Sequence, residues 1–72
     1  MSEIPLGAVD RLIRKAGVQR LSVAAAESLR DALERISLVV AKKAHECAKH
    51  SGRVTLAEED VLLALKLLEL KI

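Results

Sequence analysis

The chain has 72 residues, one cysteine and no aromatic side chain, and its 12 basic and 10 acidic residues give a formal net charge of +2. A chain of this length forms one domain at most, and since one cysteine cannot form an internal disulfide, oligomerisation is the expected support for so small a core. The composition excludes base-stacking single-strand binders and sheet-based RNA modules, and neither a membrane-spanning run nor an export leader is visible. We therefore expect an all-α domain in a reducing, cytoplasmic compartment.

The first predicted helix covers about residues 5–16. Pro5 suits its first turn, and Gly17 is a typical residue at which to end it. Apolar residues recur at helical spacing on one side of this helix, which predicts that this side is buried. Three basic residues fall together on the opposite side and form a candidate DNA surface, for which an ordinary solvated face is the alternative interpretation: Arg11, Arg14 and Lys15.

A short loop at residues 17–21 carries Arg20 just before Ser22, the predicted N-cap of the next helix. The N–H groups and dipole of a helix N-terminus attract phosphate, so we expect Arg20 and Ser22 to contact DNA. The first acid of that helix is Glu27, which predicts that an anion can approach its first turn without repulsion. A solvated loop arginine is the alternative interpretation of Arg20.

The longest predicted helix covers residues 22–50, contains neither Pro nor Gly, and ends at Ser51-Gly52. Its middle is apolar on more than one side, so it must be buried on more than one side. The rest of the chain is too short to cover it, which predicts a central helix shared between two chains. The residues expected in the dimer core are Leu29, Leu33, Ile36 and Val40.

Charged residues on the outer side of this helix are interpreted as solvated surface. The spacing of four residues predicts ion pairs between Arg30 and Glu34 and between Asp31 and Arg35. Near the end of the helix, Cys47 and His50 share a face, but a closed zinc site needs four ligands. Two copies meeting across a symmetry axis would supply four; a small thiol beside an interface histidine is the favoured interpretation, so no metal is expected.

After a second loop, the last helix is predicted over about residues 56–70. Thr55 and Glu58 have the spacing of a capping box, and two further acids follow in the first turn. The helix is apolar on two sides, so it needs more than one packing partner. This pattern again indicates assembly, in which the second leucine stripe takes part: Leu63, Leu67 and Leu70.

The order short helix, loop, long helix, loop, short helix resembles the histone fold, and the residues resemble the archaeal histones over nearly the whole chain. Four segments at matching spacings carry the resemblance: 4–17 (IPLGAVDRLIRKAG), 20–22 (RLS), 48–55 (AKHSGRVT) and 59–61 (EDV). The resemblance implies a handshake homodimer that forms tetramers or larger assemblies. It also implies that these assemblies bind double-stranded DNA and bend, wrap or compact it at the chromosome.

The resemblance also implies roles for individual residues. Arg11, Arg20 and Thr55 match DNA contacts of the family, and Arg53 matches an arginine that forms an internal ion pair with Asp60. The second loop is expected to contact DNA through Arg53, Val54 and Thr55. Meeting dimers are expected to form a four-helix bundle through Cys47, His50, Asp60 and Leu63.

Two departures from the family pattern leave a second hypothesis open. The family usually has a DNA-contacting lysine at the position of Val54, and the last helix is more apolar than expected. The chain is therefore predicted to be a DNA-compacting histone or, alternatively, a histone-fold module that mainly binds protein, including a second histone-fold chain. No catalytic constellation, cofactor motif, small-molecule site or membrane partner is predicted.

Overall fold

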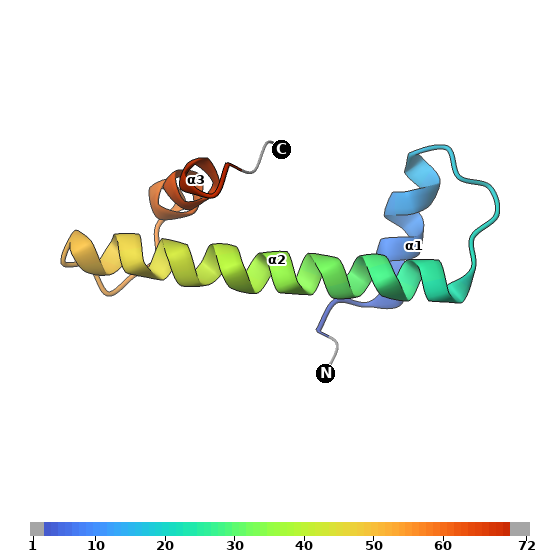
Figure 1. The fold of residues 1–72 in the computed structure, drawn as a ribbon, viewed down its shortest axis with the longest axis horizontal. Coiled ribbons are helices and arrows are strands. Elements are labelled where there is room, and N and C mark those ends of the chain that lie inside the picture. Colours follow the sequence, from blue (N-terminus) through green and yellow to red (C-terminus); the bar gives the residue numbers. More distant parts are fainter. Residues whose placement is uncertain (1–2, 70–72) are drawn as a thin grey trace. The chain divides into compact units, whose positions relative to one another are not determined.

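The computed structural model describes residues 3–69, which form three α-helices and no strand (Figure 1). They are α1 (Leu6–Lys15), α2 (Val23–His50) and α3 (Glu58–Leu67), joined by a first loop (residues 16–22) and a second loop (residues 51–57). The all-α prediction is confirmed. The last helix begins two residues later than predicted, and Leu70 lies outside the described residues.

The chain divides into two compact units, the first ending at Ile36 and the second beginning at Ser37. In the first unit, α1 packs on the start of α2 through Val9, which is fully buried, and Ala26, which is 3% exposed. The Pro5 carbonyl accepts the N–H groups of Ala8 and Val9 at 3.1 and 3.4 Å, so Pro5 caps α1 instead of occupying its first turn. Gly17 ends the helix with φ +102°, a value that favours glycine.

In the second unit, α3 packs on the last part of α2 through three buried alanines, Ala44, Ala48 and Ala64. Their small side chains let the two helices approach closely. At the end of α2, Gly52 has φ +72°, its N–H donates to the Lys49 carbonyl at 2.9 Å, and the Arg53 N–H donates to the Ala48 carbonyl at 3.0 Å. This pair of bonds is a Schellman motif, and it sets the direction in which the chain enters the second loop.

The predicted capping box at Thr55 and Glu58 is wrong. Helix α3 begins at Glu58, its N-cap is Ala57, and the carboxylate of Asp60 accepts the Ala57 N–H at 2.8 Å. Only this half of a capping box is present, because alanine has no side-chain acceptor for the returning bond. The acid that closes the turn therefore lies two residues beyond the one predicted from spacing.

The middle of α2 remains open to solvent in the single chain. On the first unit's part of the helix, Leu29 is 39% and Ile36 44% exposed; on the second unit's part, Leu38 is 62% and Val39 52% exposed. Apolar exposure on this scale along a helix indicates a surface that another chain covers. Within residues 3–69, no helix has the length and apolar character needed to cross a membrane.

Candidate nucleic-acid interface

The predicted DNA contacts fall into two groups, one in each unit. The first group lies on α1 and the first loop, and all of its side chains are exposed: Arg11, Arg14, Lys15, Arg20 and Ser22. Between residues 5 and 22 there are four basic residues and one acid, Asp10. This segment thus has a larger excess of positive charge than the chain as a whole, which suits a polyanionic partner.

Arg14 differs from the other basic residues of this group because its guanidinium already has two partners. Its Nε lies 3.0 Å from Oδ2 of Asp10, one turn earlier on α1, and its Nη1 donates to the Gln19 carbonyl at 3.0 Å. The basic side predicted for this helix is exposed, but at Arg14 the charge is already paired with Asp10. The spacing of four residues between Asp10 and Arg14 was the signal for this pair.

At the start of α2, Ser22 performs the predicted N-cap role. Its Oγ accepts the Ala25 N–H at 3.1 Å, which leaves the hydroxyl proton available to a phosphate oxygen. The first turn of α2 carries no acid, as predicted, but Asp10 of α1 lines an open hollow of about 230 Å³ together with Leu21, Ser22 and Val23. The pairing of Asp10 with Arg14 offsets that negative charge.

The second group lies in the second loop, where Arg53 is engaged by acids. Its Nη1 and Nη2 donate to the two carboxylate oxygens of Asp60 at 3.2 and 2.7 Å, and Nη1 also lies 3.0 Å from Oε1 of Glu59. Asp60 is 2% exposed, whereas the Arg53 side chain is 34% exposed. Arg53 therefore fastens the second loop to α3; the Glu59 contact was not foreseen from the sequence.

The tip of the second loop has no positive charge of its own to offer. Val54 is 99% exposed, Thr55 beside it is also exposed, and the single basic residue between positions 51 and 60 is Arg53, against three acids. A phosphate approaching this tip meets the Thr55 hydroxyl and the Val54 side chain, while the nearby Arg53 is already paired with acids. The second loop is thus suited to weak, uncharged contacts with DNA.

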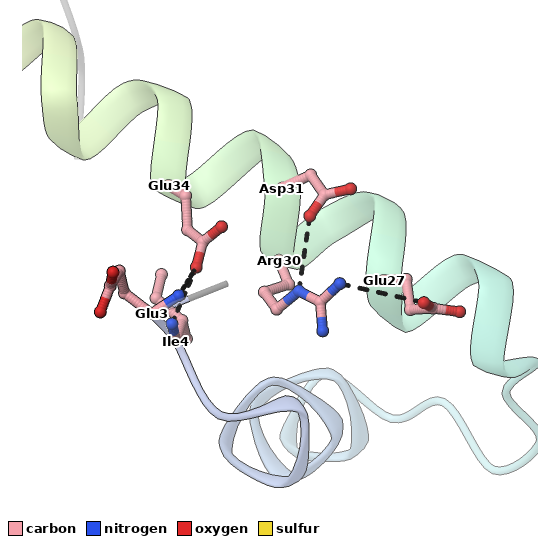
Figure 2. A network of polar contacts seen from close by, with 6 residues as sticks. All are labelled: Glu3, Ile4, Glu27, Arg30, Asp31 and Glu34. Carbon is pink, nitrogen blue, oxygen red and sulfur yellow. Dashed lines mark hydrogen bonds and ion pairs between the residues drawn. The ribbon is translucent and has the colours of Figure 1, made fainter. Parts of the chain in front are cut away.

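Glu34 does not form the ion pair predicted with Arg30 (Figure 2). Its carboxylate accepts the backbone N–H groups of Glu3 and Ile4, the latter at 2.8 Å, and so ties the segment before α1 to α2. The Ile4 N–H lowers the pKa of Glu34, with Arg30 adding a smaller attraction. Arg30 instead has its Nε 3.4 Å from Oδ1 of Asp31 and its Nη2 3.9 Å from Oε2 of Glu27.

The residues predicted to join chains are partly open in the single chain. Of the expected dimer core, Leu29 and Ile36 are exposed, and Leu33 and Val40 are half-buried. The predicted contacts between dimers all belong to the second unit: Cys47 (half-buried, free), His50 (exposed), Asp60 (buried) and Leu63 (45% exposed). Within residues 3–69, no group of three or more His, Cys, Asp or Glu side chains is placed to hold a metal ion.

Comparison with known proteins gives consistent matches over most of the chain. The family described as "Histone-like transcription factor (CBF/NF-Y) and archaeal histone" matches residues 2–65. One of the subunits of the archaeal histone HAN1 of Thermococcus zilligii is 52% identical over 66 residues, which are 92% of this chain and 98% of that protein. "Probable archaeal histone 3" of Methanocaldococcus jannaschii is 44% identical over 66 residues, with the same shares of the two chains covered.

Proposed function

This chain belongs to the family of histone-like transcription factors (CBF/NF-Y) and archaeal histones, and on that premise we propose that it packages chromosomal DNA as an assembly of dimers. Archaeal histones are structural DNA-binding proteins, so family membership confirms the prediction that the chain is not an enzyme. The observation that carries the DNA-binding proposal is the exposed basic group on α1 and the first loop. We further propose that the protein is located on the chromosome, in the cytoplasm.

The proposed contacts are with the phosphate backbone of duplex DNA. Arg11, Lys15 and Arg20 supply charge, while Ser22 and Thr55 supply hydroxyl groups. Charge contacts of this kind depend on salt and not on base sequence, and sequence preference then follows the ease with which a duplex bends. The nucleosome, in which arginines enter the minor groove where it faces inward, is the related example of this logic.

The proposed dimer is a handshake in which the two α2 helices cross. The exposed Leu29 and Ile36 support it, because a second copy is the partner that the family supplies. Ile36→Lys places a charge in that contact, whereas Ser37→Lys adds the same charge at the neighbouring position, which is polar and exposed. Sedimentation equilibrium is expected to show dimers for the parent and Ser37→Lys and monomers for Ile36→Lys; a dimeric Ile36→Lys protein contradicts this dimer face.

DNA binding is tested with the double variant Arg11→Gln/Arg20→Gln and a random-sequence duplex at low ionic strength. Arg53 is left unchanged because it holds Asp60, so its loss mixes stability with affinity. The matched control Lys42→Gln/Lys66→Gln removes the same charge elsewhere. We expect the first variant alone to lose affinity and to flatten the salt dependence by about 0.9 per lost phosphate contact. Equal binding by both variants contradicts the proposed surface.

A second candidate function is a histone-fold module that mainly binds protein. It is favoured by the fully exposed Val54 and by three exposed leucines of α3: Leu62, Leu63 and Leu67. A stable oligomer in light scattering that causes no gel shift of duplex DNA would support this alternative. If DNA is bound, the length protected from nuclease reports how many dimers assemble on it, including any contact through Cys47, His50, Asp60 and Leu63.

A further inference from the structure

We propose that Arg14 is a positioning residue, which holds the first loop so that Arg20 is presented to DNA, and is not itself a phosphate contact. The proposal rests on the proposed function. Within the described residues, the backbone between Val18 and Leu21 forms no hydrogen bond with another backbone group, and its one bond is the 3.0 Å donation from Arg14 to the Gln19 carbonyl. Arg14 is thus the contact that orders this part of the first loop.

Arg20 lies between two anchor points. On its N-terminal side, Gln19 is bonded to Arg14, and on its C-terminal side, the Leu21 side chain is half-buried beside the start of α2. Arg20 itself is exposed. Without the first anchor, the loop would be held at Leu21 alone, and ordering it on DNA would cost conformational entropy at each binding event.

Asp10 orients the guanidinium that makes this bond. The Arg14 Nε lies 3.0 Å from Oδ2 of Asp10, while Nη1 donates to the Gln19 carbonyl. The planar guanidinium can make both contacts at once, whereas a lysine ammonium cannot. The two side chains are 50% and 39% exposed, so the pair itself adds little to folding stability. Its effect is on geometry, and its negative partner also weakens any attraction of Arg14 to phosphate.

The first experiment separates positioning from direct contact by keeping the charge. Binding of a labelled random-sequence duplex is measured at several salt concentrations for the parent, Arg14→Lys, Arg20→Gln and the double variant. We expect Arg14→Lys to lower affinity about threefold to tenfold with the salt slope unchanged. In the Arg20→Gln background the same change should have no further effect, as coupled residues show in a double-mutant cycle.

Two outcomes would overturn the proposal. If Arg14→Lys binds as tightly as the parent, the ammonium has replaced a direct phosphate contact. If its cost is the same with and without Arg20, Arg14 does not act through Arg20. Failure of the parent to bind any duplex is a different result, because it refutes the proposed function itself.

Asp10→Asn provides a second test when it is compared with Glu27→Gln, which removes the same negative charge at an ion pair outside the first loop. Loss of a negative charge strengthens attraction to DNA in both variants, but only Asp10→Asn also loses the carboxylate that orients Arg14. We therefore expect Asp10→Asn to bind less tightly than Glu27→Gln. Amide exchange of residues 18–21 in the free protein should accelerate in Arg14→Lys and Asp10→Asn; unchanged exchange, or tighter binding by Asp10→Asn than by Glu27→Gln, overturns the proposal.

Discussion

Replacing Asp60 with alanine should destabilise each chain more than replacing Glu59, the other acid that contacts Arg53. The Asp60 carboxylate accepts three N–H donors: the Ala57 amide at 2.8 Å and the two Arg53 nitrogens at 3.2 and 2.7 Å. Loss of the helix cap costs about 1 kcal/mol. Loss of the charge-assisted bonds adds about 1–2 kcal/mol, because the one-third exposed Arg53 can turn to Glu59 and water. The expected total is about 2–3 kcal/mol.

Glu59→Ala is the matched control for this prediction. Glu59 also contacts Arg53, at 3.0 Å, but its side chain is 75% exposed, so its loss should cost less than about 0.5 kcal/mol. Asp60→Asn should fall between the two, since the amide oxygen can still accept the Ala57 N–H.

Urea unfolding followed by far-UV circular dichroism measures these differences, because the chain has neither tryptophan nor tyrosine for fluorescence. The protein concentration must be the same in every experiment, since assembly makes the midpoint depend on it. If Asp60→Ala is no less stable than Glu59→Ala, the buried carboxylate does not hold the second loop, and the reasoning fails.

Three further changes have defined outcomes. Val54→Lys should strengthen duplex binding and steepen its salt slope by about 0.9 per chain, and an unchanged slope in anisotropy titrations would show that this tip does not reach DNA. The Ile4 amide lowers the pKa of Glu34 in the folded chain. The ionised Glu34 side chain therefore stabilises the fold at pH values above its ordinary pKa of 4.5, and this stabilisation is lost as the pH falls through the lower pKa of the folded chain. Glu34→Gln should therefore lose less stability than the parent on acidification in urea melts; equal losses refute this. Glu69→Gly should raise the free energy of unfolding by about 1 kcal/mol, since Glu69 has φ 57°, and a less stable variant contradicts it.

Helix positions were predictable because short-range chemistry determines them. Glycines with positive φ end α1 and α2 where the sequence pattern predicts, and Ser22 caps α2 as predicted. The start of α3 was not predictable in this way, since Thr55, Glu58 and Asp60 all have spacings that suit a helix cap. The choice depended on Arg53, whose guanidinium holds the Asp60 carboxylate in the turn.

Charge pairing at the candidate site was harder to predict than charge itself. The basic residues of α1 and the first loop are exposed as expected. Spacing alone did not show that Arg14, besides pairing with Asp10, donates a hydrogen bond to the Gln19 carbonyl. Glu34 had two possible partners, a side chain one turn away and the amides of a segment thirty residues earlier, and the structure has the second. Contacts between distant segments depend on packing, which a spacing pattern does not contain.

The contacts that hold the second loop in place do not involve Val54 at its tip. Gly52, Arg53, Ala57 and Asp60 hold the loop through backbone turns and an ion pair, and Val54 has no part in that scaffold. Substitution of Val54 is therefore expected to change duplex binding, if this tip reaches DNA as proposed, at almost no cost in folding stability.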